Sequence, residues 1–310
     1  MNIIVTCPRY FSEIEVLKTK ISEKYKIDYF TPKDQGFSAD EMKTNLFDAN
    51  IAIIGDDQIN DDVMSNCTEL NLLIKWGVGI DNIEIKNIEN YPNLTILNSP
   101  ADIYIDVAEH IIFLIGSLYK KIPLIDFNLR TNGSWSKPIG NRLSGKNIGV
   151  IGYGMIGKQV SKLLKSFDAN IYFYDPNVDS ENTKNAKKQN LEYIQKKCEV
   201  IIISTSLNKQ TSKLIDKSFF NSLKKSPVII NISRGKIINE TDLIDALENQ
   251  LISGCALDVF ETEPLEQNSK LKNFENVILS SHNASNTVEA NNAVNREVTE
   301  ILLKWINNAR

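Results

Sequence analysis

Short apolar runs alternate with longer stretches of helical periodicity along the whole chain. The strands that these runs predict are Ile3–Thr6, Ile51–Ile54, Leu72–Lys75, Leu94–Leu97, Asn147–Ile151, Ile171–Tyr174, Val200–Ser204, Val228–Ile232, Gly254–Leu257 and Val277–Leu279. The runs are apolar throughout rather than at every second position, which is typical of parallel strands covered by helices on both faces. Strands separated by helical segments predict βαβ units. We therefore expect an α/β fold with doubly wound parallel sheets.

The strand and helix pattern restarts at Asn147, after the polar, loop-like stretch 131–145. A long helical pattern, Ile103–Lys120, precedes that stretch. A chain of 310 residues is long enough for two ordinary domains. The pattern therefore predicts two Rossmann-like domains, with the helix 103–120 connecting them.

Composition narrows the class of protein. Net charge is −4, so electrostatics gives no support to a general nucleic-acid-binding role. The longest apolar stretch, Val107–Leu118, is interrupted by Glu109, His110 and Gly116, so we expect no membrane span and no membrane partner. The N-terminus has no charged segment before its apolar run and is interpreted as a first strand rather than a signal peptide.

The four cysteines stand at positions 7, 67, 198 and 255, and none belongs to a Cys-x-x-Cys pair. They are expected to be buried free thiols in a reducing compartment, which favours a cytoplasmic location. Only two histidines occur, neither near a cysteine in sequence, so no metal site is expected.

The most specific local motif is Gly152-x-Gly154-x-x-Gly157, which directly follows an apolar strand and precedes a helical pattern. The first glycine permits a tight turn, the second lets the backbone approach a pyrophosphate, and the third lets the helix pack closely on the strand. The pyrophosphate would lie at the helix N-terminus, where free N–H groups favour an anion.

The next strand ends in Asp175. A carboxylate at this place can accept both ribose hydroxyls of adenosine and would repel a 2′-phosphate, so NAD is predicted rather than NADP. The alternative is that Asp175 is only a turn residue before Pro176.

Charged side chains follow three successive predicted strands near the C-terminus. Arg234 follows the strand 228–232, Asp258, Glu261 and Glu263 follow the strand 254–257, and His282 follows the strand 277–279. Each alone could be a surface residue or a helix cap. Together they supply a cation, a carboxylate and an imidazole, which hydride transfer to a 2-oxo acid requires. The other histidine, His110, lies in an apolar helical pattern and is interpreted as a packed core residue.

These motifs resemble the D-2-hydroxyacid dehydrogenase family, in its phosphoglycerate-dehydrogenase-like branch. The resemblance covers nearly the whole length, through Gly77-Val-Gly-Ile-Asp-Asn82, Asn98-Ser-Pro100, Val107-Ala-Glu109, the segment 149–157, Asn231-Ile-Ser-Arg-Gly235, the segment 254–264 and Ser281-His282. It implies an oxidoreductase that transfers a hydride between NAD(H) and a small D-2-hydroxy or 2-oxo acid.

The resemblance also implies residue roles. Arg234, Glu263 and His282 would be catalytic: His282 as acid/base, Glu263 as the partner that orients it, and Arg234 as the group that binds the carboxylate and polarises the carbonyl. Substrate contacts are implied at Lys75, Val78, Gly79, Arg234 and His282. Cofactor contacts are implied at Gly152, Gly154, Met155, Ile156, Gly157, Asp175, Ser204, Thr205, Ser206, Thr211, Ile232, Ser233, Arg234, Asp258 and His282, with Asp258 on the nicotinamide carboxamide.

The implied domain organisation is discontinuous. Residues 1–98 plus 288–310 would form the substrate-binding domain, and residues 99–287 the NAD-binding Rossmann domain. The last helix would pack back on residues 1–98. A homodimer through the NAD-binding domain is expected, with the helix 103–120 and the segment 131–145 as the contact surface.

The chain departs from the family pattern in three places. Lys75 stands where an arginine is frequent, and either reaches a substrate anion or is simply exposed. Asp102 and Ile103 replace the Gly-Asn of phosphoglycerate dehydrogenases, and Asp102 would repel a phosphate, which disfavours 3-phosphoglycerate as substrate. Ser204 and Ser206 replace a histidine and a proline near the cofactor.

Two alternatives remain open. A non-enzymatic NAD(H)-sensing protein, or a corepressor-like scaffold of the same fold, would need the glycine motif but not the pair of Glu263 and His282. A formate dehydrogenase would carry glutamine beside the histidine, because no proton moves in formate oxidation. Glu263 favours the reaction in which a proton is transferred.

Overall fold

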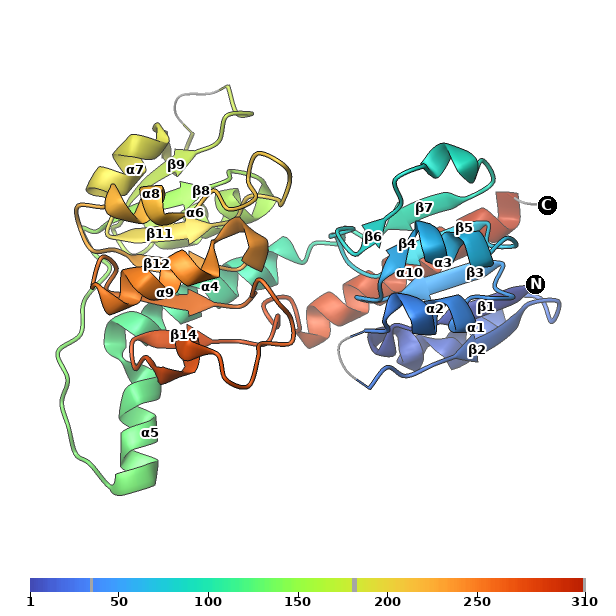
Figure 1. Ribbon diagram of the computed structural model, residues 1–310, viewed down its shortest axis with the longest axis horizontal. Helices are drawn as coiled ribbons and strands as arrows, with labels where there is room; N and C mark the ends of the chain where they lie inside the picture. The colour runs from blue at the N-terminus through green and yellow to red at the C-terminus, as the bar shows by residue number, and fades with distance from the viewer. Residues whose placement is uncertain (34–35, 180–182, 309–310) are drawn as a thin grey trace. The chain divides into compact units, whose positions relative to one another are not determined.

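The chain forms two compact units in the computed structural model, which describes residues 1–33, 36–179 and 183–308 (Figure 1). Unit 1 comprises Met1–Ile103 and Asn286–Arg310, and unit 2 comprises Tyr104–Ser285. The division therefore falls at 103/104 and 285/286, where the sequence placed it at 98/99 and 287/288.

Among the described residues, unit 1 has a five-stranded parallel sheet in the order β2-β1-β3-β5-β7. Its strands are β1 (Asn2–Val5), β2 (Lys26–Tyr29), β3 (Ile51–Ile54), β5 (Leu72–Lys75) and β7 (Thr95–Asn98). A small parallel pair, β4 (Ile59–Asn60) and β6 (Ile83–Glu84), lies apart from this sheet. The strand order reverses between β1 and β3, as in flavodoxin-like doubly wound folds.

Helices cover both faces of this sheet. One core contains the 3₁₀ helix η1 (Pro8–Glu13), α1 (Ile14–Lys20) and α10 (Val288–Asn308), and the other contains α2 (Ala39–Asn45) and α3 (Asp61–Asn66). A short 3₁₀ helix, η2 (Ile88–Asn90), precedes β7. Ile3 and Val5 of β1 pack in the first core and Ile4 in the second, which explains why the strand is apolar at every position.

The C-terminal helix α10 packs on the N-terminal part of the chain, as expected. Its buried residues Val294, Val298 and Leu302 belong to the same core as β1, β3 and β5. Polar contacts define its position: Trp76 Nε1 donates to Asn295 Oδ1 at 2.7 Å, and the Tyr10 hydroxyl lies 2.7 Å from Thr299 Oγ1. Unit 1 is therefore built from both ends of the sequence.

In the described part of the chain, unit 2 has a seven-stranded parallel sheet in the order β10-β9-β8-β11-β12-β13-β14, which is Rossmann-like. Its strands are β8 (Asn147–Ile151), β9 (Asn170–Tyr174), β10 (Lys187–Lys188), β11 (Val200–Ile203), β12 (Val228–Asn231), β13 (Gly254–Leu257) and β14 (Val277–Leu279). The predicted fold class, with two doubly wound parallel sheets, is confirmed.

The two faces of the second sheet also carry helices. α4 (Tyr104–Lys120) and α6 (Met155–Lys165) pack on one face, and α7 (Leu191–Lys197), α8 (Lys217–Asn221) and α9 (Glu240–Glu248) on the other. The remaining helical segments are α5 (Ile122–Asn132), η3 (Gly235–Ile237) and η4 (Lys270–Asn273). In Figure 1, α5 projects away from the rest of unit 2.

Sequence patterning identified ten strands, including the edge strands β7 and β14, to within one residue at each end, but it missed other elements. β2 and β10 are edge strands whose polar residues hide the pattern, and β4 and β6 have two residues each. α5 was missed because none of its residues is buried, so it lacks an apolar stripe. The residues that mark the two ends of this helix in the sequence are Pro123 in the first turn and Gly133 at the C-cap, which has φ +65°.

No helix within the described residues is long and apolar enough to cross a membrane. All four cysteines are buried and free. Burial raises the pKa of the Cys7 thiol to about 12. Over residues 1–33, 36–179 and 183–308, no group of three or more His, Cys, Asp or Glu side chains is placed to hold a metal ion.

Leu302→Ala should destabilise unit 1, because Leu302 is fully buried between α10 and the sheet. Removing such a side chain costs about 2–5 kcal/mol, through lost burial and the cavity that remains. Urea unfolding followed by tryptophan fluorescence measures the loss. Glu300→Ala, on the exposed face of the same helix, is the control and should leave the midpoint unchanged; an equal effect of the two substitutions would contradict the packing described.

Candidate active site

The glycine-rich turn joins β8 to α6 in unit 2. Gly152 has φ +92°, and a Cβ there would lie 2.5 Å from the Thr205 backbone nitrogen. A Cβ on Gly157 would lie 2.4 Å from the Gly152 oxygen, whereas a Cβ on Gly154 would meet nothing within 4 Å. The first and third glycines are therefore required by packing inside the unit. Gly154 instead leaves open space at the N-terminus of α6, where an anion can approach.

A cavity of about 340 Å³ lies along the carboxyl ends of β8, β9 and β11. Predicted cofactor residues that line it are Gly152, Gly154, Asp175, Ser204, Thr205, Ser206 and Thr211. Those that do not are Met155, Ile156, Gly157, Ile232, Ser233, Arg234, Asp258 and His282. Lining residues that the sequence did not single out are Ile151, Tyr174, Pro176, Asn177, Asn208, Gln210 and Leu214. Ile151 and Tyr174 end predicted strands, and Pro176 and Asn177 follow within three residues of one, which was the available signal.

Asp175 stands at the end of β9 and shapes this cavity. Its Oδ2 accepts from the Tyr153 backbone N–H at 2.8 Å and its Oδ1 accepts from the Asn177 N–H at 2.9 Å. Each oxygen keeps a lone pair for a further donor, as a pair of ribose hydroxyls would need. Among the described residues no lysine or arginine lines the cavity, so nothing there would stabilise a 2′-phosphate. The residues present fit NAD.

Arg234 lies in the loop after β12, and this loop is held by a buried asparagine. Asn231 Nδ2 donates to the Arg234 carbonyl at 3.0 Å, and Asn231 Oδ1 accepts from the Ser233 N–H at 3.2 Å. A Cβ on Gly235 would lie 1.8 Å from the Phe260 carbonyl carbon, so only glycine allows this loop to approach the one after β13. The sequence assigned no role to Asn231, although it begins the quoted motif.

His282 and Glu263 form a direct pair. His282 Nδ1 lies 2.8 Å from Glu263 Oε2, while Glu263 Oε1 accepts from the Phe260 N–H at 2.9 Å. Both side chains are partly exposed, at 32% and 23%. Because Nδ1 faces the carboxylate, Nε2 on the opposite edge of the ring is the nitrogen placed to exchange a proton.

Asp258 holds the loop that carries His282. The Asp258 carbonyl accepts from the His282 N–H at 2.8 Å, and its carboxylate oxygens accept from the N–H groups of Asn283 and Ala284 at 2.8 and 2.9 Å. The Asp258 side chain is fully buried. His282 itself has φ +53°, a left-handed conformation that a non-glycine residue adopts at a cost. The sequence expected Asp258 to contact nicotinamide; the structure gives it contacts that position His282.

His110 lies on α4, with its side chain 25% exposed. Its Nε2 is 3.8 Å from Asp258 Oδ1, which is longer than a hydrogen bond, and within the described residues this nitrogen has no hydrogen-bond partner. The imidazole thus packs beside the Asp258 carboxylate. Its neighbour in space could not be read from the sequence.

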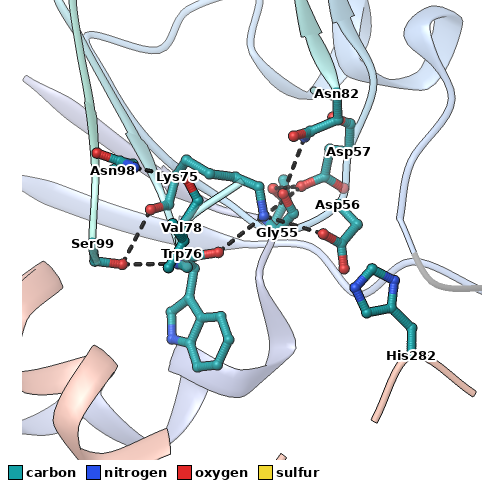
Figure 2. A network of polar contacts seen from close by, with 12 residues as sticks. Gly55, Asp56, Asp57, Lys75, Trp76, Val78, Asn82, Asn98, Ser99 and His282 are labelled. Carbon is teal, nitrogen blue, oxygen red and sulfur yellow. Dashed lines mark hydrogen bonds and ion pairs between the residues drawn. The ribbon is translucent and has the colours of Figure 1, made fainter. Parts of the chain in front are cut away.

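The predicted substrate residues of unit 1 lie at the end of β5. Figure 2 shows Lys75 pointing to Asp56, with Nζ at 3.1 Å from Asp56 Oδ1 and 2.9 Å from the Trp76 carbonyl. The Lys75 side chain is only 7% exposed, so the interpretation of it as a simply exposed residue is wrong. Val78 is exposed, at 43%, and Gly79 is half-buried.

The predicted catalytic residues therefore lie on neighbouring loops of one sheet edge. β12, β13 and β14 are adjacent parallel strands, and Arg234, Glu263 and His282 follow their respective carboxyl ends. Val78, Gly79 and Lys75 lie in unit 1, at the carboxyl end of β5.

Comparison with known proteins agrees with this geometry. Residues 112–284 match the family described as D-isomer specific 2-hydroxyacid dehydrogenase, NAD binding domain. A putative 2-hydroxyacid dehydrogenase of Staphylococcus saprophyticus is 32% identical over 294 residues, which cover 89% of this chain and 92% of that protein. D-3-phosphoglycerate dehydrogenase of Bacillus subtilis is 31% identical over 277 residues, which cover 88% of this chain and 52% of that protein. The chain thus spans about half the length of that relative.

The fold also has solved relatives. D-lactate dehydrogenase of Aquifex aeolicus, solved with NAD and lactic acid, superposes with a TM-score of 0.85 at 23% identity, covering 99% of this chain and 96% of that one. At 23% sequence identity, this similarity supports a shared fold only. From the match of residues 112–284 and the similarity to the Staphylococcus saprophyticus protein, the chain belongs to the D-isomer specific 2-hydroxyacid dehydrogenase family, and unit 2 contains its NAD binding domain.

Proposed function

We propose that this chain is an NAD-dependent dehydrogenase that interconverts a small 2-oxo acid and its D-2-hydroxy acid. The observation that carries the proposal is the pair of His282 Nδ1 and Glu263 Oε2 at 2.8 Å, in a unit that also has a cavity suited to NAD. A protein that only senses NAD(H) needs the cavity but not this pair.

NADH, when bound, would supply the hydride for the carbonyl carbon. His282 donates a proton from Nε2 to the carbonyl oxygen as its negative charge develops, and takes the proton back in the reverse direction. Glu263 keeps the ring oriented and stabilises the imidazolium. A glutamine would orient the ring without stabilising its charge, so Glu263 favours a reaction in which a proton moves.

Substrate-binding roles are assigned to each unit by itself. Arg234 would hold the carboxylate with its planar guanidinium and draw electron density from the carbonyl. In unit 1, the backbone N–H groups of Val78 and Gly79 would donate to a substrate carboxylate, and the exposure of this loop supports that role. Lys75 would act on the substrate through its ion pair with Asp56.

His282→Ala should lower kcat by about 10²–10⁴-fold, because the proton donor is lost. NADH absorbance with glyoxylate, pyruvate and hydroxypyruvate measures turnover, and fluorescence transfer from tryptophan to nicotinamide should still report NADH binding. Lys272→Ala, an exposed change in unit 2, serves as the control. Near wild-type turnover of His282→Ala would remove this imidazole from the mechanism; NADH binding without turnover of any 2-oxo acid in the unaltered protein would favour a sensor.

Asp175→Asn should reduce the preference for NADH over NADPH by about tenfold, equivalent to about 1.4 kcal/mol. The amide can keep one acceptor for the Tyr153 N–H but no longer repels a 2′-phosphate. Dissociation constants of the two cofactors, measured by fluorescence titration, give the ratio. Asp179→Asn removes an exposed carboxylate of the same segment and should leave the ratio unchanged. If Asp175→Asn leaves the ratio of the two dissociation constants unchanged, the preference for NADH does not depend on the Asp175 charge.

We further propose a cytoplasmic homodimer. Four buried free thiols suit a reducing compartment. The dimer is supported by apolar side chains of α5 and the segment after it that unit 2 leaves in solvent, namely Ile122 (55% exposed), Phe127 (62%), Trp135 (79%) and Ile139 (90%). Exposed aromatic and apolar side chains are enriched at protein interfaces.

Trp135→Asp should weaken this dimer by at least about tenfold, because burying an unpaired carboxylate is unfavourable. Light scattering after gel filtration over a dilution series measures the mass. Phe47→Asp places the same charge at another exposed aromatic residue, in unit 1 and 69% exposed, and should remain dimeric. A monomeric unaltered protein would refute the dimer.

A further inference from the structure

The buried ammonium of Lys75 is held by two oxygen acceptors, one of them on Asp56. The Lys75 ammonium is held by Asp56 Oδ1 at 3.1 Å and by the Trp76 carbonyl at 2.9 Å, and the Lys75 side chain is 7% exposed (Figure 2). The Asp56 side chain is 39% exposed. The cation is therefore covered by protein while its carboxylate partner faces solvent in part.

The loop that carries Asp56 is rigidly built. Asp57, fully buried, accepts from Thr6 Oγ1 at 2.6 Å and from the backbone N–H groups of Gly55 and Phe37 at 2.9 and 2.8 Å. Asn82 Nδ2 donates to the Asp57 carbonyl at 2.6 Å. Burial raises the pKa of the Asp57 carboxyl, and the donors Phe37, Thr6 and Gly55 oppose the rise. Asp56 is thus presented to Lys75 by a loop whose shape does not depend on the pair.

The loop that follows Lys75 is held by two residues at the end of the neighbouring strand β7. Ser99 Oγ accepts from the Gly77 N–H at 2.8 Å and donates to the Lys75 carbonyl at 3.2 Å. Asn98 Nδ2 donates to the Val78 carbonyl at 2.7 Å. The N–H groups assigned to the substrate carboxylate, those of Val78 and Gly79, follow directly. The ammonium and its carboxylate partner therefore lie next to the backbone that would receive the substrate.

The ion pair of Lys75 and Asp56 determines the charge that a substrate encounters beside the loop 76–79. An unpaired ammonium beside the loop would attract a second anionic group, because Coulomb interactions are strong where water is excluded. Asp56 neutralises that charge and, being partly exposed, would itself repel an approaching phosphate or second carboxylate. Asp102, also exposed in unit 1, adds to the negative charge of this unit.

We propose that the Lys75–Asp56 pair is a specificity determinant that selects 2-oxo acids whose side chain carries no second negative charge. The inference rests on the proposed function. In this role Lys75 anchors the loop 76–79 and gives no cationic contact to a distal group, while Asp56 excludes substrates such as a phosphorylated 2-oxo acid.

The test compares two substrates that differ only by a phosphate, hydroxypyruvate and phosphohydroxypyruvate. The unaltered protein should have the higher kcat/KM with hydroxypyruvate. Asp56→Asn keeps an acceptor for Lys75 but removes the charge, and it should raise kcat/KM for phosphohydroxypyruvate relative to hydroxypyruvate by about tenfold or more. Asp28→Asn is the matched control, because Asp28 is ion-paired with Lys26 in the same unit and its side chain has the same exposure, 39%.

A second readout does not require turnover. Calorimetric titration of the protein without nicotinamide should give weaker binding of 3-phosphoglycerate than of D-glycerate, and Asp56→Asn should narrow the difference. If Asp56→Asn does not fold, Asp56→Ser removes the same charge. An active protein that prefers phosphohydroxypyruvate, or whose ratio Asp56→Asn leaves unchanged, overturns this inference alone. A protein inactive with every 2-oxo acid rejects the proposed function and the inference with it.

Discussion

Parallel strand pairing is the constraint on which both units depend. A parallel sheet must be covered on both faces, and this requirement makes the central strands apolar at every position and places helices on each side. It also directs every loop that follows a strand to the same edge of the sheet. In unit 2, the strands are followed by the glycine turn, Asp175, Arg234, Glu263 and His282. The strand arrangement alone therefore brings these residues to one edge of the sheet, even before their side chains make contact.

Within that frame, backbone positions are fixed by buried polar side chains rather than by regular structure. Asp258 is the main example, because its carboxylate and carbonyl together accept three N–H groups of the segment 282–284. A left-handed conformation at a residue such as His282 costs on the order of 1 kcal/mol, and these hydrogen bonds offset it. Asn231 does the same for the loop of Arg234. The side chains of His282 and Arg234 are therefore positioned by residues that need not touch a substrate.

The cations near the strand ends of the two units differ in how far they are buried. In unit 2, Arg234 is half-buried and follows a strand end, where a planar guanidinium can receive a carboxylate. In unit 1, Lys75 is buried and its charge is compensated by Asp56. A buried cation would be strongly unfavourable without that partner. A cation at or just after the end of a parallel strand is thus left partly open to solvent in unit 2 and is covered and neutralised in unit 1.

Much of this protein could be derived from its sequence. Apolar runs and glycine spacing determine the α/β class, the central strands and the dinucleotide turn, because they reflect local geometry and burial. The polar edge strands β2 and β10, the two-residue strands β4 and β6, and α5 were not predicted, because short or partly exposed elements carry little apolar pattern. The roles of Asp258, Asn231 and Asp56 were decided only by the tertiary structure: each acts on backbone or charge that is distant in sequence, and such pairings arise when the strands are placed side by side. Lys75 shows the difference most clearly, because its charge was readable from the sequence and its partner was not.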